Sequence, residues 1–103
     1  MGARRLSPLW VACNNNHTEA VDALLRLASV DVNQTSAYGQ SALWRACYND
    51  NRAIVAALLA HPRIDVNLAE EYGTSPLWRA AVSKHKEVVA MLLKCALAPP
   101  PSA

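Results

Sequence analysis

The chain has 103 residues, of which 52% are hydrophobic and 17% are charged, a composition of one small folded domain that excludes the disordered and collagenous classes. The net charge of +2 is too small to argue for nucleic-acid binding by itself. No apolar run approaches the ~18 residues of a membrane-spanning helix, and the N-terminus lacks the apolar segment of a signal peptide. We therefore expect no nucleic-acid and no membrane partner.

A sequence motif returns at an interval of 34 residues. Ser-Pro-Leu-Trp at 7–10 becomes Ser-Ala-Leu-Trp at 41–44 and Ser-Pro-Leu-Trp at 75–78. Residues 7–40 and 41–74 are identical at 15 of 34 positions. A period of this length indicates stacked supersecondary units, each of which needs its neighbours for stability.

The period divides the chain into five segments. These are a basic lead at 1–6, repeats at 7–40, 41–74 and 75–97, and a Pro-rich tail at 98–103 that we expect to be disordered. Charge is uneven among them, because the first repeat is net negative and the segment from residue 75 onward is net positive. A solvated terminal surface is the simplest interpretation of this basic end.

The middle repeat illustrates the elements that each unit predicts. Ser41 is the expected N-cap of a short first helix, which should end near residues 49–50, because Asn and Asp tolerate the left-handed conformation. A second helix is predicted over 52–60, before Pro62. Asp-Val-Asn at 65–67 is predicted to be extended, and Tyr-Gly at 72–73 to form a tight hairpin with glycine at positive φ.

The cysteines are expected to be free thiols. Cys13 and Cys47 occupy the same place in successive units, which would stack roughly 10 Å apart, too far for a disulfide. Each follows an alanine in an apolar stretch, which favours small buried filler. Free thiols suit a reducing compartment, so we expect an intracellular, cytoplasmic protein, with the nucleus as the alternative.

Together these motifs resemble ankyrin repeats over residues 7–97. The Ser-Pro-Leu-Trp motif is similar to the family's Thr-Pro-Leu-His, and His-Lys-Glu-Val-Val at 85–89 resembles the start of its second helix. Asp-Val-Asn and the glycine before the serine motif match as well. The resemblance implies an all-α solenoid of stacked helix pairs joined by β-hairpin-like loops.

Two departures from the family pattern carry physical consequences. Tryptophan replaces the family's histidine, which ties the helix start to its hairpin by hydrogen bonds, and an indole N–H can only donate. The family's glycine between the two helices becomes Asn16, Asp50 and Lys84. A lysine at positive φ costs ~1 kcal/mol or a little more, so the third turn should be strained or differently shaped.

Chemical motifs are weak in this sequence. No nucleophile motif, phosphate-binding loop or pair of catalytic carboxylates stands out, and Glu70 and Glu71 are expected to be solvated. Cys13 and His17 lie four residues apart, but the expected helix break and the missing second ligand pair argue against a metal. We expect a protein without enzymatic activity, metal or cofactor.

Two further signals have competing interpretations. Ser7 follows two arginines, as in a site for a basophilic kinase, but it is also the expected helix cap. The three tryptophans suggest an aromatic ladder for a ligand or base, but a structural role inside each cap motif is the simpler interpretation.

The resemblance implies a concave recognition surface made by the hairpin tips and the first helices. Carried over by position, the predicted partner-binding residues are Tyr38, Gln40, Arg45, Tyr48, Asn49, Glu71, Tyr72, Thr74, Arg79, Val82 and Ser83. Tyrosine and arginine are enriched at binding hot spots. The alternative is that the tyrosines only pack the hairpins and that the arginines pair with Glu70 or Glu71.

The main hypothesis is therefore a monomeric, non-enzymatic module that binds another protein with an acidic or mixed surface. The second hypothesis is a structural spacer, a segment of a longer ankyrin array with no partner of its own.

Overall fold

The computed structural model describes residues 6–97, so most of the predicted basic lead and the Pro-rich tail at 98–103 lie outside the described residues. Within that range the chain forms six α-helices and no strand. They are α1 (Pro8–Asn14), α2 (Thr18–Leu25), α3 (Ala42–Tyr48), α4 (Arg52–Leu59), α5 (Pro76–Val82) and α6 (Lys86–Leu97), with a 3-10 turn, η1, at Ala37–Gly39. The predicted all-α class is confirmed.

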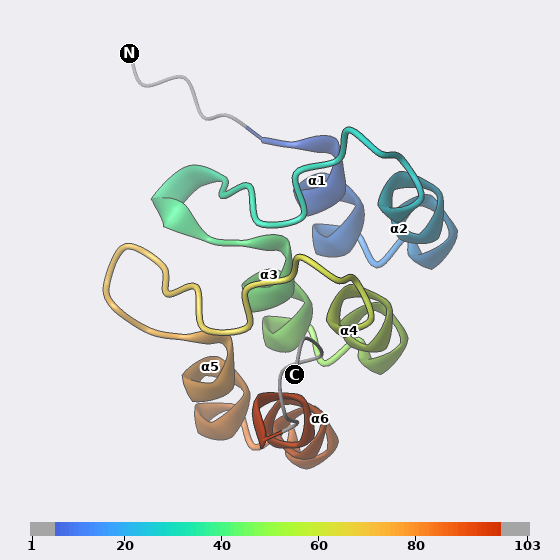
Figure 1. Cartoon of the computed structure of the whole chain (residues 1–103). Helices are drawn as coiled ribbons and strands as arrows, with labels where there is room; N and C mark the ends of the chain where they lie inside the picture. Colours follow the sequence, from blue (N-terminus) through green and yellow to red (C-terminus); the bar gives the residue numbers. More distant parts are fainter. Residues whose placement is uncertain (1–5, 98–103) are drawn as a thin grey trace.

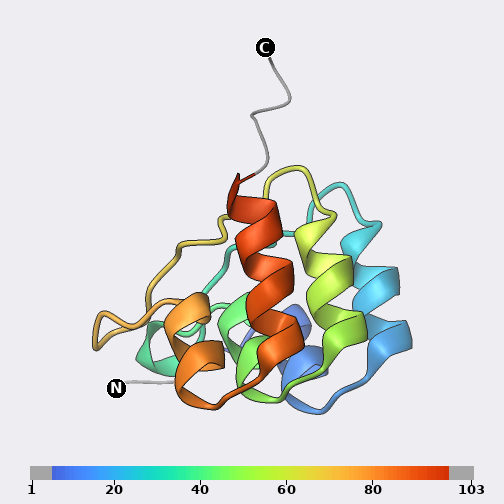
Figure 2. The same ribbon diagram turned by 90° about the horizontal axis from the view of Figure 1, so that it is seen from below.

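The helices form two parallel rows. Figure 1 shows α1, α3 and α5 in one row and α2, α4 and α6 in the other, and α3 packs against both α1 and α5. The loops at 26–41 and 60–75 extend beyond the row of first helices, which Figure 2 shows from a second direction. The three units of the sequence are thus three successive helix pairs.

Hydrogen bonds at the helix starts explain why the serine motif recurs. The serine hydroxyl of each unit accepts from the backbone N–H three residues later, at 3.0 Å for Ser7 and 3.1 Å for Ser41 and Ser75. Proline occupies the first helical position of α1 and α5, where no backbone donor is needed. The predicted caps are confirmed.

One core runs between the two rows. Leu43 of α3 and Ile54, Val55 and Leu58 of α4 have no exposed surface, so the middle unit supplies much of its centre. The i, i+1, i+4 spacing of the α4 residues places them on one face of that helix, as the sequence predicts. The buried cluster continues into the first unit through Val21 and into the third through Val88.

The turn between the two helices is the same in all three units. Asn16, Asp50 and Lys84 have φ values of 59°, 56° and 62°. The third turn is therefore strained rather than differently shaped, because the stacking of successive pairs fixes its geometry whatever residue is present.

Replacing Lys84 by glycine is expected to raise the free energy of unfolding by about 1 kcal/mol, because glycine adopts positive φ without the steric cost of a Cβ. Urea unfolding followed by circular dichroism measures the change. Asp50→Gly is the matched control at the equivalent position, and a smaller gain is expected there because aspartate tolerates this conformation. Equal gains would contradict the assignment of strain to Lys84.

The Asp-Val-Asn segments are turns, so the prediction of extended chain is wrong. The backbone N–H of Asn33 donates to Asp31 Oδ1 at 3.1 Å, and that of Asn67 donates to Asp65 Oδ1 at 3.0 Å. An aspartate side chain that bonds the backbone two residues ahead closes an Asx turn. Asn33 also joins two units, since its Oδ1 accepts from Asp65 N at 2.8 Å.

The loops that precede α3 and α5 turn at glycines. Gly39 and Gly73 have φ values of 72° and 84°, as predicted, and Gly73 N donates to Glu70 O at 2.8 Å. An isolated antiparallel bridge pairs Thr35 with Ser41. No helix in the described range is long and apolar enough to cross a bilayer.

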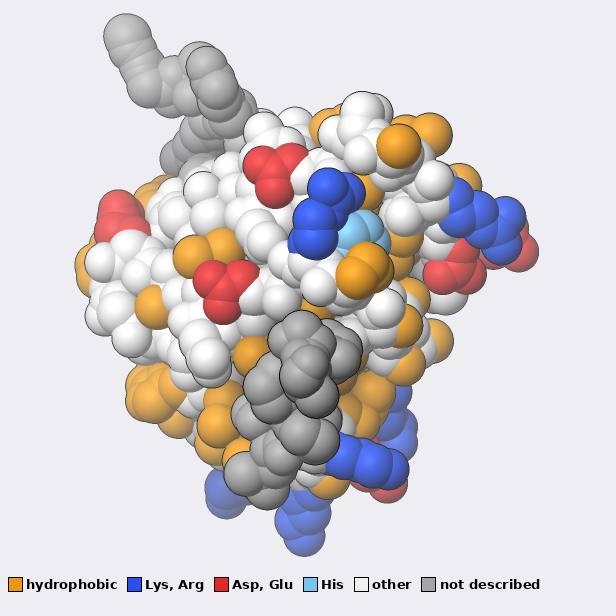
Figure 3. Space-filling model, in the orientation of Figure 1, with side chains coloured by type: hydrophobic (Ala, Val, Ile, Leu, Met, Phe, Trp, Pro, Cys, Tyr) orange, Lys and Arg blue, Asp and Glu red, His pale blue; other side chains and the backbone are white. Residues whose placement is uncertain are grey.

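Charge follows the direction of the stack. In the first unit Glu19, Asp22 and Asp31 outnumber Arg26, whereas the third unit carries four basic side chains against Glu87. Figure 3 shows Lys and Arg side chains gathered at the edge formed by α5 and α6. The first and third units are therefore of opposite net charge.

Candidate partner-binding surface

Two arginines from successive units lie against aromatic rings on the side of the first helices. Arg45 Cζ is 4.4 Å from the ring centroid of Tyr48 and 5.8 Å from that of Trp10. Arg79 Cζ is 5.2 Å from the Tyr48 centroid and 5.4 Å from that of Trp78. We call these five residues the arginine–aromatic ladder. Each such contact at an exposed site contributes roughly 0.5–1 kcal/mol.

Hydrogen bonds fix the two guanidinium groups further. Arg45 Nε donates to Asn14 Oδ1 at 2.8 Å, and Arg79 donates to Ser83 Oγ from Nε at 3.2 Å and from Nη2 at 3.0 Å. Neither arginine forms an ion pair with Glu70 or Glu71 in the described part of the chain, where Arg52 pairs with Glu87. The alternative of arginine–glutamate pairing is therefore wrong, because aromatic rings, the Asn14 amide and the Ser83 hydroxyl hold these side chains instead.

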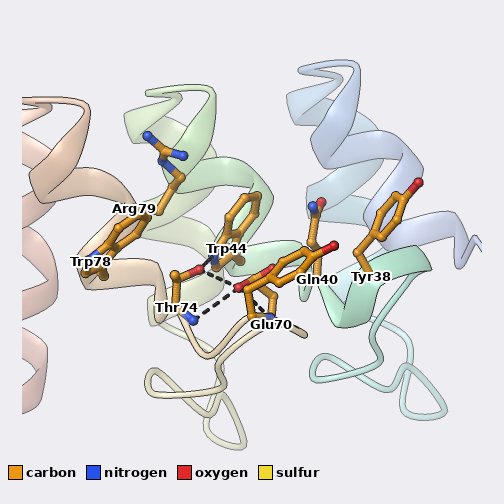
Figure 4. A pocket seen from close by; sticks show the side chains of 8 residues that line it. Tyr38, Gln40, Trp44, Glu70, Thr74, Trp78 and Arg79 are labelled. Atoms are coloured by element: carbon orange, nitrogen blue, oxygen red, sulfur yellow. Dashed lines mark hydrogen bonds between the residues drawn. The ribbon is translucent and has the colours of Figure 1, made fainter.

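A groove adjoins the ladder where the two loops meet α3 and α5 (Figure 4). Its volume is about 420 Å³, and four of its eight lining side chains are aromatic. The lining residues are Tyr38, Gln40, Trp44, Glu70, Tyr72, Thr74, Trp78 and Arg79. A groove of this kind offers apolar area beside a few fixed polar groups, as binding sites commonly do.

Glu70 is buried in the wall of this groove, so the prediction that it is solvated is wrong. Its residue is only 8% exposed, and Oε1 accepts hydrogen bonds from Thr74 Oγ1 at 2.7 Å, Tyr72 N at 3.0 Å and Thr74 N at 3.1 Å. The hydrogen bond from the Thr74 side chain lowers the pKa of Glu70, against the opposing effect of burial. The tight turn at 70–74 aims these donors at the carboxylate, which therefore stays ionised at neutral pH.

The indoles of successive units have different partners. Trp44 Nε1 donates to Thr74 Oγ1 of the next loop at 3.3 Å, which confirms that an indole can serve as a donor between helix and loop. Trp10 Nε1 is buried without a hydrogen-bond partner among the described residues. Gln40 stands in the first loop where Thr74 stands in the second. An unpaired buried donor costs about 1–3 kcal/mol.

Gln40→Thr is expected to raise the free energy of unfolding by about 1 kcal/mol, because it places a hydroxyl where the indole N–H of Trp10 lacks a partner. Chemical denaturation measures the change. Gln40→Val serves as the control, because valine has the shape of threonine but no hydroxyl to accept the hydrogen bond. A gain of equal size in both variants would show that side-chain shape, not a hydrogen bond, is responsible.

The predicted residues divide into four groups, with Arg79 in two of them. Tyr38, Gln40, Tyr72, Thr74 and Arg79 line the groove, and Arg45, Tyr48 and Arg79 belong to the ladder. Glu71 and Val82 are exposed and belong to neither the groove nor the ladder. Asn49 and Ser83 have structural partners.

Asn49 joins two units. Its Nδ2 lies 3.2 Å from both Cys13 O and Asn14 O. The backbone N–H of Glu71 likewise donates to Tyr38 O at 2.8 Å and so connects the two loops. These contacts hold the surface together and are not free for a partner.

Sequence reasoning left Trp10, Trp44, Glu70 and Trp78 out of the site. The tryptophans were assigned a structural role in the cap, which their backbone N–H groups do have, but their rings also form the ladder and line the groove. The 34-residue spacing of the tryptophans was the sequence signal that could have placed them in the site. No repeated pattern marks Glu70, because Ser36 occupies the equivalent position in the preceding loop.

The cysteines behave as packed apolar side chains. Cys13 and Cys47 are free and have no exposed surface, as predicted, and burial raises the pKa of each thiol from 9.0 to about 12. No cluster of three or more His, Cys, Asp or Glu side chains that could hold a metal ion occurs in residues 6–97.

Alkylation at pH 8 is expected to modify half-buried Cys95 quickly and to spare Cys13 and Cys47 until the chain unfolds, because the thiolate is the nucleophile. Because these two thiols ionise at lower pH in the unfolded chain than in the folded one, their raised pKa values contribute to the free energy of unfolding below pH 9.0. This contribution is lost as the pH rises toward about 12. Peptide mass spectrometry reads the modification. Labelling in urea is the control, where all three should react alike.

Comparison with known proteins agrees with this architecture. The family model for ankyrin repeats, in three copies, matches residues 9–99. The chain belongs to the ankyrin repeat family. Ankyrin repeats are generally protein–protein interaction modules and are typically non-enzymatic. No curated protein in the comparison matches the chain.

Proposed function

We propose that this chain is an ankyrin solenoid with β-hairpin-like loops that binds another protein along its concave side. The binding surface is formed by the ladder and the adjoining groove. We further propose an intracellular site of action, since free buried thiols suit a reducing compartment.

The preorganised state of Arg45 and Arg79 carries the proposal. Rings and hydrogen bonds hold both guanidinium groups in place before any partner arrives. An arginine that is already ordered loses little conformational entropy on binding, and its planar group suits a carboxylate. The partner surface we infer therefore carries carboxylates that meet the ladder and an apolar side chain that enters the groove.

The test compares proteins captured from native lysate by the wild type, by a Tyr48→Ala/Arg79→Ala variant and by Arg26→Ala. Arg26 is exposed at the end of α2, so its loss is a matched change of charge away from the surface. We expect the same captured proteins with the wild type and Arg26→Ala, and their loss with the double variant. Equal capture by all three would contradict this surface.

Binding of each captured protein is then titrated at rising salt. Because exposed charges are screened within about 8–10 Å at 0.1–0.15 M salt, a carboxylate-bearing partner should bind more weakly at higher ionic strength. Salt-independent binding would contradict the charged part of the proposal. The melting temperature of the double variant is expected to fall by roughly 6–24 °C, since the three lost cation–π contacts contribute about 1.5–3 kcal/mol together, so capture is compared well below its unfolding transition.

A further inference from the structure

The two ends of the helix stack expose surfaces that are covered inside the stack. Trp44 is 6% exposed, whereas Trp78, its equivalent in the last unit, is 47% exposed. Pro76 is fully buried, whereas its equivalent Pro8 is exposed. In each pair the residue is the same, and the exposed member lacks a neighbouring unit on that side within residues 6–97. Each end therefore presents the surface that, within the chain, receives another unit of this fold.

These surfaces are apolar and well defined. The C-terminal face consists of Trp78 and Ala81 of α5 and Val89 and Leu93 of α6, of which Leu93 is 44% exposed. The N-terminal face consists of Pro8, Ala20, Leu24 and Leu27, of which Leu27 is 51% exposed. Pro8, Leu24 and Leu27 line a groove of about 200 Å³. Exposed apolar surfaces of this kind mark interaction sites.

We propose that a second copy of this chain stacks head to tail on the first, with its N-terminal face on the C-terminal face of the first copy. The second copy would then occupy the place of a fourth unit. This self-association uses the ends of the stack, and it shares only Trp78 with the ladder and the adjoining groove.

Each contact between two units of the chain predicts an equivalent contact at the junction, between the residues at the equivalent positions of the 34-residue repeat. The side chains that such contacts need are present at the junction. Arg52 pairs with Glu87 between the second and third units. The equivalent pair at the junction is Lys86 of the first copy with Glu19 of the second, again of opposite charge.

The polar donors are preserved as well. His85 Nδ1 lies 3.0 Å from Cys47 O, and the equivalent pair at the junction is His17 of the second copy with Ala81 O. Asn49 Nδ2 donates to Cys13 O, and the equivalent donor is Asn15 of the second copy. One polar contact from each of the two internal boundaries can thus form in the same register, both with Ala81 O as the acceptor.

Charge selects this orientation over the others. The first unit is net negative and the third is net positive. Head-to-tail stacking therefore brings opposite charges together, while stacking through two N-terminal or two C-terminal faces brings like charges together, which favours the head-to-tail arrangement. A head-to-tail contact is heterologous, so it can extend beyond two copies.

The test uses two variants that each inactivate one face at an exposed position outside the ladder and the groove, Leu27→Asp and Leu93→Asp. Analytical ultracentrifugation from about 1 µM to 1 mM spans weak to moderate association. We expect concentration-dependent species larger than a dimer for the wild type and monomers for each variant alone. Mixing the two variants should give a 1:1 dimer that grows no further, because one intact face of each kind remains.

Other outcomes would overturn the proposal. Dimers of Leu27→Asp alone would indicate contact through two C-terminal faces, and dimers of Leu93→Asp alone would indicate contact through two N-terminal faces. A wild-type chain that stays monomeric throughout would exclude self-stacking. Circular dichroism of each variant checks that its helices are intact.

Charge reversal tests the register. Glu19→Lys and Lys86→Glu should each weaken association a few-fold, as expected for one exposed pair, and the double variant should restore it. Additive weakening in the double variant would show that these two side chains do not meet, and would overturn the proposed register.

Discussion

Leu43→Ala is expected to lower the free energy of unfolding by about 2–5 kcal/mol, because it leaves a cavity in a site that has no exposed surface. Leu43 lies in α3, which packs against α1, α4 and α5. A domain of this size has roughly 5–15 kcal/mol of stability in all, so the loss is a large part of it. Urea unfolding followed by circular dichroism measures the effect.

The position of Leu43 in the middle unit adds a second expected result. In a repeat protein each unit contacts only its neighbours, so the middle unit alone couples the first to the third. Weakening it should broaden the unfolding transition as well as shift it.

Leu77→Ala is the matched control, because it makes the same chemical change at the equivalent position of the third unit. Leu77 is only half-buried, so the expected loss is smaller, about 1–2 kcal/mol, and the transition should stay sharp. A transition broadened equally by both variants would contradict the conclusion that the middle unit couples the others.

Much of the fold could be predicted because each unit repeats the same local signals. The serine caps, the proline at the first helical position and the apolar stripe of α4 act within a few residues of each other, so sequence spacing is enough to locate them. Asp-Val-Asn was misassigned because a β-branched valine favours extended chain, whereas the aspartate carboxylate bonds the backbone two residues ahead and closes a turn.

The candidate surface could be predicted only in part. Periodicity places Arg45 and Arg79 on one side, but it does not reveal that Arg45 reaches Trp10 and Asn14 of the preceding unit, since that depends on the offset between stacked helices. The burial of Glu70 was missed for a different reason. A carboxylate in a loop is usually solvated, and here three donors within four residues of it offset the cost of burial.

Gly39→Ala is expected to lower the free energy of unfolding by about 2–3 kcal/mol, from two separate effects. Its φ of 72° lies in the left-handed region, where a Cβ costs about 1–2 kcal/mol. The added Cβ would also lie 3.2 Å from the backbone N of Glu71, which donates to Tyr38 O at 2.8 Å. The second loop would therefore have to move, and the hydrogen bond that joins the two loops would weaken.

Gly73→Ala separates the two effects. Gly73 has a φ of 84°, but a Cβ there meets no atom within 4 Å, so only the backbone strain remains. We expect Gly39→Ala to be the more destabilising by about 1 kcal/mol, the usual net contribution of one hydrogen bond. In a domain of this size that is a difference of about 4–8 °C in melting temperature. Equal melting temperatures would show that the loops do not depend on one another, and the groove between them would then lack a fixed shape.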